Sequence, residues 1–77
     1  MAMQDLNAQL LQAHEADDHN ALVSLYAQVA DQCEAAQDVE ATCFYLTQAF
    51  VFALDSDHPE ARELNRRLVA YGREVPL

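Results

Sequence analysis

The segment from Ala41 to Leu54 limits what this chain can fold into, because it is a helical stretch without charge. Its sequence, ATCFYLTQAFVFAL, contains only three clearly polar residues, Thr42, Thr47 and Gln48. On a helix with 3.6 residues per turn, its apolar side chains lie on every side. A helix that is apolar all round has to be covered by neighbouring elements. We therefore expect this helix to lie at the centre of the fold or of an interface.

The composition indicates an all-α fold within one small domain, residues 1–77. The chain has 77 residues, with one glycine and two prolines, and this is too few turn residues for long sheets. Alanine, leucine and glutamine are abundant, and all three favour helices. We expect four helices in an antiparallel bundle, with the uncharged helix packed between the helices before and after it.

Three aspartates at nearly even spacing predict where the helices begin. Asp18, Asp38 and Asp57 each precede an amphipathic run and suit an N-cap, where a carboxylate accepts backbone N–H groups. Pro59 falls in the expected first turn of the last helix, and Gly72 suits its end. The predicted helices span residues 5–16, 19–36, 39–55 and 59–71, and the tail 73–77 is expected to fray.

The charge distribution favours some partners over others. The net charge is −9, and residues 1–57 contain ten acids but neither lysine nor arginine. Such a surface repels nucleic acid and anionic membranes and attracts a basic protein or peptide. The alternative interpretation is that the negative charge only keeps a small domain soluble.

Other features favour a cytoplasmic protein. The first ten residues, MAMQDLNAQL, lack the basic and apolar regions of a signal peptide. The uncharged segment is shorter than the ~20 residues that cross a bilayer. In that compartment Cys33 and Cys43 are expected to be free thiols, although a disulfide is possible if their Cα atoms come within ~7 Å.

The two central helices carry a spaced pattern of small and large residues. Its positions are Tyr26, Val29, Ala30 and Cys33 on the first helix, and Thr42, Leu46 and Ala49 on the second. This pattern resembles a tetratricopeptide repeat over residues 23–54. The chain departs from the family in having alanine at position 30, where glycine is usual, and in its late proline.

The resemblance implies an inner groove that binds extended peptides. On the first helix of the repeat, Asp31 and Glu34 would face this groove, and Arg62 and Arg66 would border it. Family members that bind a terminal carboxylate use Lys, Arg or Asn at such positions, whereas this chain offers acids. The resemblance therefore implies a basic segment as the ligand.

A second candidate surface lies on the uncharged helix, where Phe44, Tyr45 and Phe52 share one side. Aromatic residues are enriched in the buried centres of interfaces. If Phe44 or Phe52 stays uncovered, a second copy of the chain would cover it, since large apolar patches are rare on monomers. The alternative function is thus a structural homodimer with the uncharged helix at its seam and no separate ligand.

The arginines near the end of the chain allow two interpretations. Arg62, Arg66 and Arg67 cluster on the last predicted helix, and Glu63 is placed to form an i, i+4 ion pair with Arg67. These arginines either offset the acidic remainder of the chain or form an anion site. We favour the first interpretation.

No pattern in the chain predicts an enzyme, and we expect no metal or cofactor. Only two serines and one glycine are present, so neither a serine triad nor a phosphate-binding loop is indicated. His14 and His19 are five residues apart and would point about 140° from each other on a continuous helix. The sequence predicts a non-enzymatic module that binds a protein or peptide.

Overall fold

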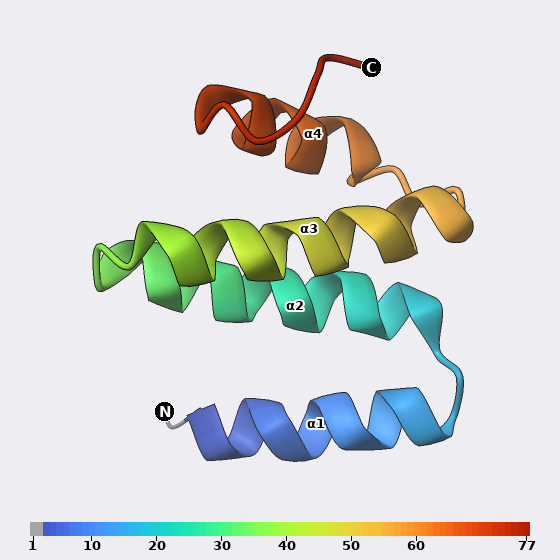
Figure 1. Ribbon diagram of the computed structural model, residues 1–77. Coiled ribbons are helices and arrows are strands. Elements are labelled where there is room, and N and C mark those ends of the chain that lie inside the picture. Colours follow the sequence, from blue (N-terminus) through green and yellow to red (C-terminus); the bar gives the residue numbers. More distant parts are fainter. Residues whose placement is uncertain (1–2) are drawn as a thin grey trace.

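The computed structural model describes residues 3–77, with side chains from residue 5 onward. Within this range the chain forms four helices and no strand (Figure 1). The helices are α1 (Met3–Glu15), α2 (His19–Ala35), α3 (Val39–Asp55) and α4 (Ala61–Ala70). The all-α prediction is therefore confirmed, and residues 1–2 of the expected domain lie outside the described part.

The four helices lie side by side in chain order, from α1 at the bottom of Figure 1 to α4 at the top. The most extensive packing is between α2 and α3, while α1 packs on α2 and α4 packs on α3. The Cα atoms fill a flat volume of 31 × 29 × 14 Å. As predicted, α3 lies between its two neighbours in the chain, but the flat arrangement leaves one of its sides open.

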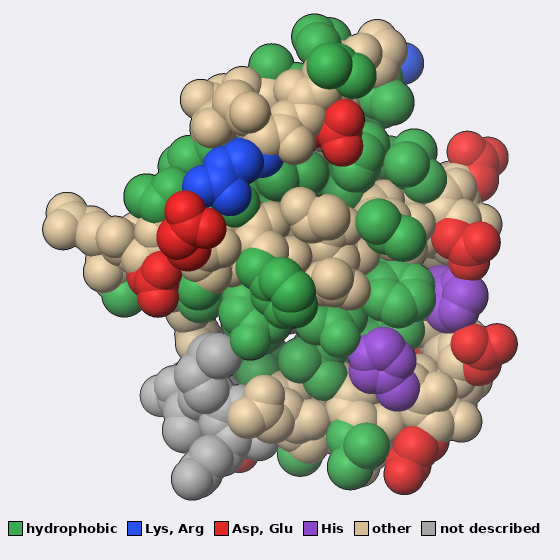
Figure 2. Space-filling model, in the orientation of Figure 1, with side chains coloured by type: hydrophobic (Ala, Val, Ile, Leu, Met, Phe, Trp, Pro, Cys, Tyr) green, Lys and Arg blue, Asp and Glu red, His purple; other side chains and the backbone are tan. Residues whose placement is uncertain are grey.

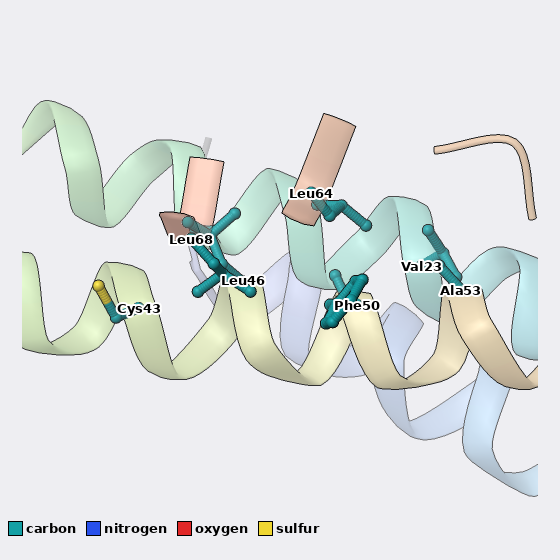
Figure 3. Close-up of a cluster of buried hydrophobic side chains, with 9 residues drawn as sticks. Val23, Cys43, Leu46, Phe50, Ala53, Leu64 and Leu68 are labelled. Atoms are coloured by element: carbon teal, nitrogen blue, oxygen red, sulfur yellow. The ribbon is translucent and has the colours of Figure 1, made fainter. Parts of the chain in front are cut away.

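The core is built around the inner side of α3. Leu46, Ala49 and Ala53 are fully buried there, and Figure 3 shows α3 side chains meeting Leu64 and Leu68 of α4. The alanines allow close approach between helices, while the leucines fill the space between them. A second cluster joins α1 to α2 through Leu6, Ala13, Leu22, Leu25 and Val29.

The three interhelical turns share one conformation that recurs every 20 residues. A left-handed residue ends each helix, namely Asp17 (φ 55°), Gln37 (φ 62°) and Asp57 (φ 54°). The next residue donates its N–H to the carbonyl five residues back, as in Asp38 to Cys33 at 3.0 Å. This is the Schellman motif, which satisfies carbonyls at a helix end. Gly72 (φ 74°) ends α4 in the same way.

The aspartates after the first two turns cap the helices that follow, as predicted. Asp18 accepts a hydrogen bond of 3.1 Å from the Ala21 N–H, and Asp38 accepts one of 3.1 Å from the Ala41 N–H. The prediction of Asp57 as the third N-cap was wrong, because Asp57 occupies the left-handed position of its turn.

The position equivalent to Asp38 in the third turn is His58, twenty residues later. Its Nδ1 accepts a 3.0 Å hydrogen bond from the Glu60 N–H, so the chain turns once more before the helix begins. The helix α4 starts at Ala61, two residues later than predicted, and its N-cap Glu60 makes no side-chain capping bond.

The C-terminal segment 73–77 does not fray, which corrects the sequence-based expectation. The buried side chain of Asn65 donates a 2.9 Å hydrogen bond to the Val75 carbonyl. The same side chain accepts one of 3.2 Å from the Leu77 N–H. Two bonds from one buried amide therefore hold the segment against α4, while the Val75 and Leu77 side chains stay exposed.

Candidate interaction surface

The open side of α3 carries a line of exposed apolar residues. Phe44, Val51 and Leu54 are 57%, 54% and 52% exposed. Their spacing of seven and then three residues places them on one side of the helix, together with Thr47. We call Phe44, Thr47, Val51 and Leu54 the α3 stripe. Within this single chain, the neighbouring helices leave the stripe uncovered, so the expectation that α3 also lies in an interface stays a prediction.

An aromatic cluster borders the stripe on the side toward α1. Tyr26 of α2 stacks with Tyr45 and Phe52 of α3, with ring centroids 6.2 Å and 6.0 Å apart. Phe44 meets Tyr45 edge to face at 5.0 Å and so joins the cluster to the stripe. Of the three residues predicted on this helix, Phe44 is largely exposed, whereas Tyr45 and Phe52 are half-buried among the aromatic rings.

Two histidines complete this cluster. The Nε2 atom of His14 lies 2.9 Å from the Tyr26 hydroxyl, and the His14 ring meets Phe52 edge to face at 5.9 Å. Burial, followed by the influence of Tyr45, raises the pKa of Tyr26. Figure 2 shows hydrophobic side chains gathered on this face with histidines beside them and acidic side chains around.

His19 lies between two carboxylates at the end of α3. Its Nδ1 is 2.7 Å from Oδ2 of Asp55, and its Nε2 is 2.9 Å from Oδ1 of Asp17. The ring also packs on Phe52 at a centroid distance of 5.2 Å. Both ring nitrogens therefore face carboxylate oxygens, which only accept hydrogen bonds. Within the described residues, no group of three or more His, Cys, Asp or Glu is arranged to hold a metal ion.

The two acids predicted to face a peptide groove are bonded to other side chains of the same molecule. Arg67 of α4 places its Nη2 atom 2.9 Å from Asp31 Oδ1 and 3.2 Å from Glu34 Oε1. The Tyr71 hydroxyl donates to Glu34 Oε2. Asp31 and Glu34 therefore tie α2 to α4 through Arg67 and Tyr71, two residues that the sequence analysis did not connect to them.

The predicted ion pair between Glu63 and Arg67 was wrong, because Arg67 turns toward α2. Glu63 instead pairs with Arg66, whose Nε and Nη2 atoms lie 2.8 Å and 2.6 Å from its carboxylate oxygens. These bonds lower the pKa of Glu63 and raise that of Arg66. Arg62 is exposed on α4, and Arg66 lines a shallow cleft together with Glu34 and Tyr71.

A cleft of about 360 Å³ continues the stripe toward the C-terminal segment, and it is lined by Glu40, Cys43, Phe44, Thr47 and Arg73. Arg73 crosses it to reach Glu40, with Nη2 and Oε2 2.9 Å apart, and this bond raises the pKa of Arg73. Cys43 is buried and Cys33 is half-buried, and both are free thiols. Burial, with a smaller effect of Asp38, raises the pKa of Cys33.

Comparison of the chain with protein-family models, with curated proteins and with solved structures finds no match. The resemblance to a tetratricopeptide repeat therefore stays a prediction. Among residues 3–77, each helix is too short or too polar to cross a membrane.

Proposed function

We propose that this chain is a non-enzymatic interaction module whose α3 stripe binds another protein. One observation carries the proposal: three large apolar side chains lie exposed along one side of a helix without a charge between Ala41 and Leu54. Single exposed hydrophobic residues are normal on a protein surface. A continuous line of them is a feature of binding sites.

The energetics support the same conclusion. Full burial of a Val, Leu or Phe side chain contributes about 1.5–3 kcal/mol. Phe44, Val51 and Leu54 are about half exposed, so covering them offers roughly 1 kcal/mol each. A partner that covers all three gains binding energy without any rearrangement of the core beneath them.

A photo-crosslinking experiment in cells of the source organism tests this function. A benzoylphenylalanine at position 51 is expected to form a discrete adduct with another protein. The control places the same group at Gln28, an exposed position on α2. Leu54→Asp is expected to abolish the adduct while circular dichroism shows unchanged helicity. The same adduct from position 28, or no adduct from position 51, would contradict the proposal.

A further inference from the structure

We infer that the partner of the α3 stripe is a basic amphipathic helix, which lays apolar side chains along the stripe and places a cation near Asp17 and Asp55. This inference rests on the proposed function and adds the chemistry of the partner. Three observations lead to it: the length of the stripe, the lack of free backbone groups beside it, and the distribution of charge around it.

The length and chemistry of the stripe favour a helical partner. Phe44 and Leu54 are ten residues apart, which is about 15 Å along a helix axis. Apolar residues at i, i+4, i+7 and i+11 of a second helix cover the same distance. The backbone groups of α3 are already bonded within the helix, so an extended peptide lying on the stripe would find no backbone partners. A helical partner forms the hydrogen bonds of its backbone within itself and needs no backbone partners on the stripe.

The charge at the two ends of the stripe is unequal. At one end Arg73 already pairs with Glu40. At the other end Asp17 and Asp55 flank His19, and their side chains are 88% and 60% exposed. Two carboxylates thus stand beside one imidazole, and much of each remains open to a partner. A lysine or arginine of the partner would donate to the exposed carboxylate oxygens of Asp17 and Asp55.

The same charges disfavour a second copy of this chain as the partner. Each copy carries a net charge of −9, so two acidic surfaces would have to approach each other. In a parallel pairing of two α3 helices, Asp55 would face Asp55 of the second copy. In an antiparallel pairing Asp55 would meet Glu40 and Arg73, a pair that is already neutral. A basic helix provides the missing positive charge in either orientation.

The test uses three labelled peptides with the full chain. One is a helical 18-residue peptide with leucines along one side and lysines on the other. The second has glutamate in place of lysine, and the third is a scrambled basic peptide of the same composition. Fluorescence anisotropy at physiological salt is expected to show that the basic amphipathic peptide binds at least about tenfold more tightly than either of the others.

Matched variants separate the stripe from general charge attraction. Val51→Asp is expected to weaken binding roughly tenfold or more, because it places an unpaired carboxylate under the apolar side of the peptide. Leu11→Asp makes the same charge change at an exposed leucine on α1, and it is expected to leave binding within about twofold. Asp55→Asn is expected to weaken binding and to reduce its dependence on salt.

Three outcomes would overturn the inference. Equal binding of the scrambled peptide, or of the acidic one, would remove the role of amphipathicity or of charge. A dimer of the chain alone in sedimentation, lost in Val51→Asp, would make a second copy the partner. Failure of the basic peptide to bind while position 51 still forms its adduct would refute the partner class and leave the proposed function standing.

Discussion

The Tyr71 hydroxyl, at the end of α4, donates a 2.5 Å hydrogen bond to Oε2 of Glu34 on α2. The other oxygen of this carboxylate accepts a bond of 3.2 Å from Arg67. Both α2 and α4 pack on α3, and the side chains of Tyr71, Arg67 and Glu34 join α4 to α2 across it. The bond requires a protonated hydroxyl, which is why Glu34 raises the pKa of Tyr71 above its ordinary value.

This bond predicts a change in stability at alkaline pH. A group whose pKa is raised on folding stabilises the native state below its unfolded pKa, about 10 for tyrosine. That stabilisation is lost as the pH rises through the higher folded pKa. Tyr71→Phe is therefore expected to make the loss of thermal stability above about pH 10 less steep and to remove one late step from the tyrosinate absorbance titration.

Tyr26 also has a raised pKa, so the variant should keep a late titration step from that residue. Glu34→Gln serves as the second variant, since it keeps an oxygen that accepts a hydrogen bond and removes the charge. Tyr71 should then ionise at lower pH than in the parent chain. Identical titration curves for the parent and for Tyr71→Phe would contradict this prediction.

Asn65 is predicted to hold the C-terminal segment in place. Asn65→Ala removes two hydrogen bonds, to Val75 and Leu77, each worth about 0.5–1.5 kcal/mol. We expect a loss of about 1–3 kcal/mol in urea unfolding, together with faster hydrogen exchange at the Leu77 amide.

Asn7→Ala provides the matched control, because Asn7 is exposed on α1. This variant should be neutral or slightly stabilising, since alanine is the better helix former. Unchanged exchange at Leu77 in Asn65→Ala would show that the segment is held by other contacts.

Short-range rules predicted most of the local structure, and the predictions that were wrong have local causes. Asp18 and Asp38 were correctly predicted as N-caps because each precedes an amphipathic run. The prediction of Asp57 as an N-cap was wrong because an acid also occupies the left-handed position in two of the three turns, as Asp17 and Asp57 show. Comparing positions 18, 38 and 58 rather than the nearest acids would have placed the turn correctly.

The candidate surface was predictable only in part. Phe44 was identified from the lack of charge on its helix, and it is exposed. The pattern of apolar residues could not tell which side of α3 stays open, because that depends on the flat arrangement of four helices. The rotation of α4 similarly decided that Arg67, rather than Arg62 or Arg66, reaches Asp31 and Glu34.

The two sides of α3 are predicted to differ sharply in their tolerance of substitution. Leu46 is fully buried between α3 and its neighbours, so Leu46→Ala should cost about 2–5 kcal/mol through the cavity that it leaves. Leu54→Ala makes the same chemical change on the exposed stripe and should stay within about 0.5 kcal/mol of the parent. Urea unfolding followed by circular dichroism measures both, and equal costs would mean that the stripe is covered in the isolated chain.

The shared helix-ending motif predicts opposite effects on stability when a glycine is introduced at position 37 and when the glycine at position 72 is replaced. Gln37 adopts φ 62°, a conformation that costs a non-glycine residue about 1–2 kcal/mol. Gln37→Gly removes this strain but adds freedom to the unfolded chain, so we expect a net gain of about 0.5–1 kcal/mol. Gly72 has φ 74°, and a Cβ atom at this position would meet nothing within 4 Å.

Because Gly72→Ala creates no clash, its expected loss of about 1 kcal/mol would come from backbone conformation alone. The two variants thus test one physical cause with opposite signs in the same urea unfolding assay. A stabilising Gly72→Ala would mean that the end of α4 does not need the left-handed conformation. If Gln37→Gly lowers the free energy of unfolding, the side chain of Gln37 stabilises the native state by more than its backbone strain destabilises it.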